Sequence, residues 1–105
     1  MNQATKTKAK KSKATCAVEC RWLEQIPNIG SAAAADLRLI GITEPQQLRG
    51  EDAMAMYQKL CRLTKQRHDP CVLDTFMAAV DFMDGAPAAP WWNYTAQRKV
   101  RFGVV

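Results

Sequence analysis

Residues 23–34 read Leu-Glu-Gln-Ile-Pro-Asn-Ile-Gly-Ser-Ala-Ala-Ala, and this stretch decides the fold of the 105-residue chain. Pro27 ends a preceding helix, because the residue before a proline is driven out of the α region. Asn28 and Gly30 both tolerate positive φ, which suits a tight connection. A second helix follows over residues 32–40. The stretch therefore predicts a helix, a hairpin turn and another helix.

The segments on either side of this turn predict further helices. The first covers residues 17–25, with Val18, Trp22 and Ile26 on one face. A short helix over residues 43–50 follows a capping-box pattern, and a fourth over residues 51–63 carries an apolar stripe. A fifth begins at Asp69-Pro70 and ends at Asp84-Gly85. No segment predicts a strand, so we expect an all-α, compact bundle of five helices.

The net charge of +5 lies at one end of the chain. Five lysines within the first 13 residues supply it, and the rest of the chain balances ten basic against ten acidic residues. Residues 1–14 predict a disordered basic arm, since like charge and low hydrophobicity cannot offset the ordering entropy. The arm is either a solubility tail or a phosphate-contacting segment. Residues 15–101 then form the folded domain, and residues 102–105 a C-terminal tail.

Hydropathy and cysteine usage predict a cytoplasmic protein. The chain has no apolar run of about 18 residues and no apolar core of a secretory signal. In a reducing compartment its four cysteines stay thiols. We expect Cys61 and Cys71 to behave as small buried hydrophobic residues.

The hairpin also has a chemistry of its own. A turn that opens a helix points free backbone N–H groups at the positive helix end, which can hold one phosphate. We predict a DNA phosphate seat from the hairpin amides and nearby cations, formed by Asn28, Ile29, Gly30, Ser31, Ala32, Arg38, Lys65 and Arg67. The turn over residues 65–68 would act as a second, degenerate hairpin.

Residues 23–34 resemble the helix-hairpin-helix motif, with Asn28 where the motif has its first glycine. A lysine or arginine common after the hairpin is replaced by Ser31-Ala32-Ala33. Together with the runs at residues 61–74 and 90–92, the chain resembles the pathogenicity-locus family of small bacterial proteins over roughly residues 20–101. The resemblance implies a SAM-like helix-hairpin-helix domain related to the C-terminal domain of bacterial competence regulators. It implies no established activity.

Two other constellations have competing interpretations. Cys61, His68 and Cys71 are weak metal candidates, because their spacing departs from the short gaps of zinc sites; packing in the core is the alternative. The aromatic group Trp91, Trp92 and Tyr94 either folds back to cap the core or forms a stacking platform. With one histidine and no orienting group, we predict no catalytic residues, no enzyme activity and no cofactor.

These patterns lead to one main functional hypothesis and one alternative. The first is a non-enzymatic, sequence-independent DNA-binding module, for duplex DNA, acting in DNA repair or damage response. The alternative is a protein-protein interaction module on the same helical scaffold. Neither hypothesis includes a membrane or a small-molecule substrate.

Overall fold

A computed structural model describes residues 12–103 of the chain. Within that range it contains four α-helices, α2 to α5, and four short 3₁₀ turns, η1 to η4, and no strand. The α-helices are α2 (Ser31–Leu39), α3 (Ala53–Thr64), α4 (Pro70–Met83) and α5 (Thr95–Phe102). The turns are η1 (Ala17–Glu19), η2 (Leu23–Gln25), η3 (Pro45–Leu48) and η4 (Trp91–Tyr94). The prediction of an all-helical chain is confirmed.

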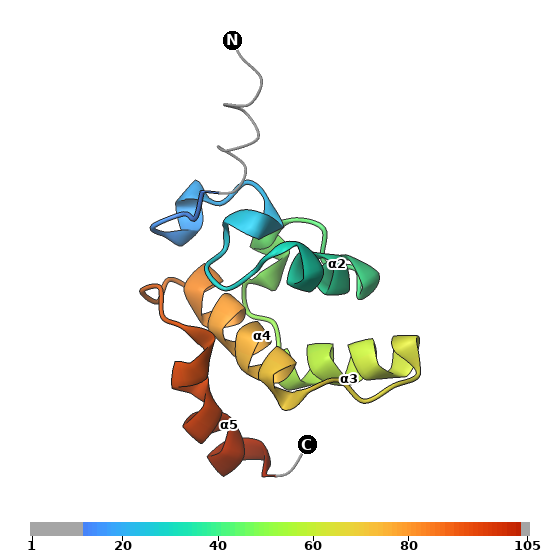
Figure 1. Ribbon diagram of the computed structural model, residues 1–105. Coiled ribbons are helices and arrows are strands. Elements are labelled where there is room, and N and C mark those ends of the chain that lie inside the picture. Colours follow the sequence, from blue (N-terminus) through green and yellow to red (C-terminus); the bar gives the residue numbers. More distant parts are fainter. Residues whose placement is uncertain (1–11, 104–105) are drawn as a thin grey trace.

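Helix α4 is the central element, and α3, α5, η3 and η4 pack against it (Figure 1). Its carboxylate N-cap, Asp69, accepts a hydrogen bond from the Cys71 amide, and Pro70 occupies the first turn, where its missing N–H costs nothing. Nine of its residues are buried, on more than one face of the helix. A helix that is apolar on several sides can serve as a core that other helices surround.

The predicted first helix, residues 17–25, is wrong: the chain there forms the separate turns η1 and η2. Gln25 Oε1 accepts hydrogen bonds from the backbone amides of Arg21 and Trp22, at 2.6 and 2.9 Å, and so takes donors that a continuous helix would use. The supposed apolar face is not buried either, because Val18 is 89% exposed. Instead the spacing of buried Cys20, Leu23 and Ile26 follows a three-residue period.

Two further differences change the helix count from five to four. The predicted short helix at residues 43–50 is the single 3₁₀ turn η3, whose N-cap amide bonds the Gln47 side chain at 2.8 Å. Helix α5 falls in a segment that the sequence left unassigned. Its anchor is Arg98, whose Nε donates to the fully buried Asp74 carboxylate at 2.6 Å. That ion pair joins residues far apart in the sequence, so periodicity alone did not indicate it.

The end of the predicted disordered arm lies on the domain. Residues 1–11 are outside the described residues. The Ala14 side chain is buried, and its amide donates to the Gln25 carbonyl at 2.9 Å. None of the helices within residues 12–103 combines the length and the apolar character that crossing a membrane requires.

Candidate functional site at the hairpin

The hairpin between η2 and α2 depends on a left-handed residue. Asn28 has φ 75°, and the conformation that the sequence favoured for it is confirmed. Gly30 has φ −91° and serves as the N-cap of α2, so its freedom for positive φ is not used. The Ile29 side chain is fully buried, and its amide donates to the Ile26 carbonyl at 3.0 Å. That amide is therefore already occupied within the turn.

The Asn28 side chain fastens the linker before η4 to the hairpin. Its Nδ2 donates to the Ala89 carbonyl at 2.8 Å, and its Oδ1 accepts from the Trp91 amide at 3.2 Å. One side-chain amide thus satisfies both a backbone acceptor and a backbone donor from a segment some 60 residues away. The result is a fixed position for Trp91 against the hairpin.

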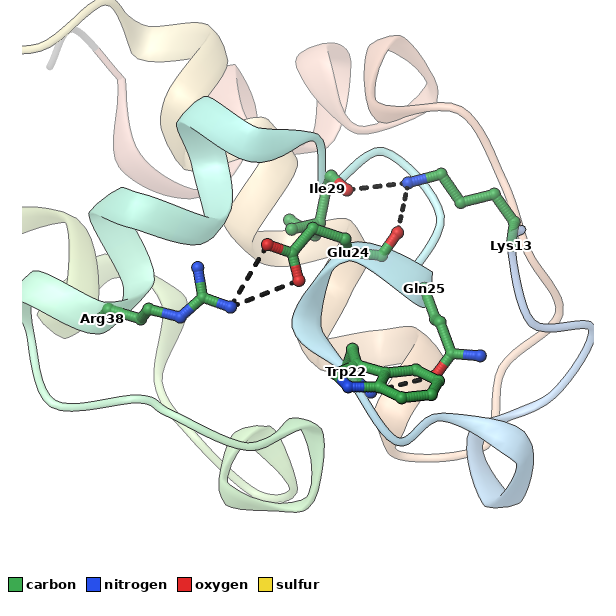
Figure 2. A network of polar contacts seen from close by, with 6 residues as sticks. All are labelled: Lys13, Trp22, Glu24, Gln25, Ile29 and Arg38. Atoms are coloured by element: carbon green, nitrogen blue, oxygen red, sulfur yellow. Dashed lines mark hydrogen bonds and ion pairs between the residues drawn. The ribbon is translucent and has the colours of Figure 1, made fainter. Parts of the chain in front are cut away.

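Lys13 closes the other side of the hairpin (Figure 2). Its ammonium donates to the carbonyl oxygens of Glu24, Ile26 and Ile29, at 2.8, 3.2 and 2.7 Å. Burial lowers the pKa of Lys13, and the nearby Glu24 carboxylate partly opposes that shift. This cation from the end of the arm is used to hold the turn.

The three predicted phosphate-binding cations have other contacts or structural roles in the described part of the chain. Arg38 is paired with Glu24 through two 3.2 Å contacts, which Figure 2 also shows. Lys65 is the left-handed C-cap of α3, and Arg67 lies near the Tyr57 hydroxyl. No hydrogen bond or ion pair within residues 12–103 joins Lys65 or Arg67 to residues 28–32. The exposed first-turn residues Ser31 and Ala32 complete the predicted set.

The weak metal candidates do not form a site. His68 Nε2 is 2.8 Å from the Thr64 hydroxyl, and the His68 amide lies 3.5 Å from Cys61 Sγ. Cys71 is on the first turn of α4, and the part of the chain that is described has no group of three metal-ligating residues. All four cysteines are free thiols; Cys20 is buried, and Cys61 and Cys71 are half-buried.

The aromatic residues near the C-terminus differ in their burial. Tyr94 packs against the core, Trp91 is half-buried, and Trp92 is 62% exposed. The two tryptophan rings meet edge to face, with centroids 5.6 Å apart. Trp91 also borders a cavity, which gives it a role that neither prediction included.

That cavity, which we call the hairpin pocket, has a volume of about 230 Å³. It lies between the hairpin and α2 on one side and the first turns of α4 on the other. Its lining residues are Asn28, Ala32, Ala33, Asp36, Cys71, Val72, Thr75, Phe76 and Trp91. Of these, sequence reasoning had assigned no role to Asp36 and Thr75. The alanine run was the available signal, since small side chains at a helix surface leave room.

A second cavity, the acidic pocket, lies where α3 begins and α4 and α5 end. Its volume is about 340 Å³, and four carboxylates, those of Glu51, Asp52, Asp81 and Asp84, line it with Arg101 as their counter-charge. Most of these carboxylates already have partners. Asp52 accepts from the Ala55 amide at 3.1 Å, and Asp84 from the Gly50 amide at 2.8 Å. Asp81 is hydrogen-bonded to the Tyr94 hydroxyl.

The fold and its cavities describe a small all-helical protein with an apolar pocket beside a hairpin. Residues 16–100 match the model of the Pathogenicity locus family, and the chain belongs to that family. It is also similar to a protein named mitomycin resistance protein McrB, from Streptomyces lavendulae. The two are 47% identical over 77 residues, which is 73% of each chain. No solved structure matches the chain.

This relative contradicts the predicted function. The sequence predicted a DNA-binding module acting in repair or damage response, whereas the relative's name places it in resistance to a drug. The structure gives a physical reason for the error. Arg38, one of the cations of the predicted phosphate seat, is paired with the Glu24 carboxylate, and Lys13, from the predicted arm, is bonded to the hairpin's own Ile29 carbonyl.

Proposed function

We propose that this chain takes part in resistance to mitomycin-type compounds and acts in the cytoplasm without catalysing a reaction. The observation that carries the proposal is the 47% identity to a mitomycin resistance protein over 73% of both chains. Identity at this level extends through most of the folded domain, so the two proteins are expected to share their core and their pockets.

The state of the cysteines supports a role without covalent catalysis. Burial raises the pKa of Cys20, and burial together with Asp69 raises the pKa of Cys71. A thiol held protonated at neutral pH is a poor nucleophile, because the thiolate is the reacting form. The imidazole of His68, the single histidine in the chain, hydrogen-bonds the Thr64 hydroxyl, and within residues 12–103 it has no carboxylate or thiol partner.

We further propose that residues 23–39 form a helix-hairpin-helix unit in which the 3₁₀ turn η2 replaces the first helix. The left-handed Asn28 and the N-cap Gly30 support this relationship. In this proposal the unit serves as a scaffold, holding α2 and Trp91 at a fixed separation from α4.

Susceptibility measurements test the resistance role. The chain would be expressed in a mitomycin-sensitive bacterium, and the minimal inhibitory concentration of mitomycin C measured against an empty vector. The matched control is Leu73→Asp, which places a charge at a fully buried position and should unfold the domain. We expect the minimal inhibitory concentration of mitomycin C to rise several-fold for the native chain alone. The minimal inhibitory concentration of an antibiotic of another class should not change. Equal susceptibility of all three strains, with the native chain detected in the cells, would contradict the role.

A further inference from the structure

We propose that the hairpin pocket binds the planar ring system of a mitomycin-type compound, non-covalently, with an N–H group of the ligand donating to Asp36. This inference rests on the proposed resistance role and specifies how that role is carried out. Mitomycins are compact fused-ring quinones that carry amino and carbamate N–H donors. The flat ring system can pack on the apolar lining of the pocket, and an N–H donor can pair with Asp36.

The pocket has the composition of a small-molecule site. Its floor is apolar, with Phe76 fully buried and Val72 packed against the core. Trp91 supplies an aromatic wall on which a flat ring can stack. Ala32 and Ala33 also line the pocket, and their small side chains leave the space open. Ligand sites are typically apolar cavities of this kind with a few convergent polar groups.

Two polar groups in the pocket have no side-chain partner. Neither the Asp36 carboxylate nor the Thr75 hydroxyl makes a side-chain hydrogen bond or ion pair within residues 12–103, and both residues are half-buried. A half-buried carboxylate gains most from a donor that enters with the ligand, because a hydrogen bond to an ionised acceptor is stronger than a neutral one. The carboxylate therefore selects a ligand with an N–H group.

The shape of the pocket is held before any ligand arrives. The Trp91 amide is bonded to Asn28 Oδ1 at 3.2 Å, and Asn28 Nδ2 holds Ala89 at 2.8 Å. Trp92 contacts the Trp91 ring edge to face at 5.6 Å, which limits its rotation. A preorganised wall lowers the ordering entropy that binding must overcome.

The thiol of the pocket favours retention of an intact ligand. The pKa of Cys71 is raised by burial, by its hydrogen bond to Asp69 and by the Asp69 charge. A protonated thiol does not attack an electrophile at an appreciable rate at neutral pH. With a volume of about 230 Å³, the cavity is slightly smaller than typical drug sites of about 300 Å³ and above. It would hold the ring system and the N–H group that donates to Asp36, and leave the other substituents outside.

Equilibrium dialysis of the purified full chain against mitomycin C tests the inference directly. The blocking variant is Ala32→Leu, whose larger side chain fills the pocket from an exposed position on α2. Leucine has a high helix propensity, so α2 should keep its structure. Its matched control is Ala35→Leu, an exposed residue of the same helix that does not line the pocket. We expect one bound ligand per chain, about ten-fold weaker binding for Ala32→Leu, and native affinity for Ala35→Leu.

The charge of Asp36 is tested in the same way. Asp36→Asn should weaken binding about five-fold, and the control Glu51→Gln, which removes a carboxylate from the acidic pocket, should not. Circular dichroism of each variant confirms that the fold is kept, and intact-mass spectrometry should show no added mass.

Three outcomes would overturn the inference. These are the absence of binding, equal loss in Ala32→Leu and Ala35→Leu, and a covalent adduct on Cys71. Resistance in cells without binding in dialysis would remove this inference and leave the proposed role intact. Unchanged susceptibility in cells together with binding in dialysis would remove the role and leave the binding site.

Discussion

The hairpin pocket and the acidic pocket lie on different parts of helix α4, and they differ in how their polar groups are used. In the acidic pocket three of the four carboxylates are engaged, as a helix N-cap, as an acceptor for a turn amide, and with Tyr94. In the hairpin pocket neither the Asp36 carboxylate nor the Thr75 hydroxyl has a side-chain partner among residues 12–103. The comparison teaches that the larger and more charged cavity is mostly occupied with holding the structure together. The smaller cavity retains groups for recognition.

The two pockets also differ in what holds their walls. Helix α5 forms one wall of the acidic pocket, and the buried Asp74–Arg98 ion pair fixes it to α4. The Asn28 amide and the Lys13 ammonium hold the hairpin wall through backbone contacts. Mutations of the Asp74–Arg98 pair and mutations of Asn28 or Lys13 should therefore lower the free energy of unfolding by different amounts. The first should disturb the acidic pocket, and the second the hairpin pocket.

Loss of the buried ion pair is expected to have the largest effect. Asp74→Ala leaves Arg98, which is 8% exposed, without its partner, and should lower the free energy of unfolding by about 3–5 kcal/mol. Urea denaturation of the purified chain measures this. If Asp74→Ala fails to fold, Asp74→Asn keeps the shape and some hydrogen bonding and should lose less. A loss under about 1 kcal/mol for Asp74→Ala would mean that the pair does not anchor α5.

Removal of the Asn28 side chain should have an intermediate effect, confined to the hairpin side. Asn28→Ala introduces a residue that disfavours the left-handed region and deletes two hydrogen bonds, at a cost of about 2 kcal/mol. Asn28→Gly keeps the backbone conformation and should cost about half as much. The exposed Asn93, mutated to Ala, is the control in urea denaturation. Equal losses for Asn28→Gly and Asn28→Ala would show that the backbone conformation contributes nothing.

A smaller effect is expected from Lys13→Met. This change removes three hydrogen bonds to hairpin carbonyls that water can partly replace, so we expect a loss of about 1 kcal/mol at pH 7. The native pKa of Lys13 is lowered from 10.5. At pH values just below 10.5 the unfolded chain therefore binds more protons than the folded chain. As pH rises through this range, the free energy of unfolding of the native chain should increase relative to that of Lys13→Met. The exposed Lys59→Met variant should show neither effect.

The smallest expected change in stability comes from Tyr94→Phe, at the rim of the acidic pocket, and it appears only at alkaline pH. Burial and the hydrogen bond with Asp81 raise the pKa of Tyr94 to about 12. Its stabilising contribution is complete below the unfolded value of about 10 and is lost as pH rises through the folded value. Tyr94→Phe should therefore show a flatter decline than the native chain in thermal unfolding between pH 10 and 12. Parallel declines would mean that the Tyr94 environment is not as described.

Local patterns predicted the helices whose ends carry clear signals. Asp69-Pro70 located the start of α4, and the left-handed Asn28 was expected from its side chain. The helix at residues 17–25 failed because Gln25 competes for backbone amides, an interaction that a hydrophobic period does not register. Helix α5 was not found because its anchor, Arg98, pairs with Asp74, 24 residues earlier.

The candidate site was predictable only in part, and for a related reason. The sequence indicated the importance of residues 28–32, but it linked them to a DNA-binding function that the similarity to a mitomycin resistance protein contradicts. Arg38 looked like a free cation because Glu24, 14 residues away, could not be placed beside it. The pocket itself joins α2, α4 and Trp91, and the Asn28 contact that brings Trp91 to the hairpin spans 63 residues. Such a cavity follows from tertiary packing and has no local pattern.

Amide and indole chemical shifts of the full-length, isotope-labelled chain, titrated with mitomycin C, test the central claim most directly. The account predicts that changes concentrate at Ala32, Asp36, Thr75 and the Trp91 indole, while Asp52 and Asp84 in the acidic pocket do not move. Changes centred on the acidic pocket, or no changes at all, would contradict it.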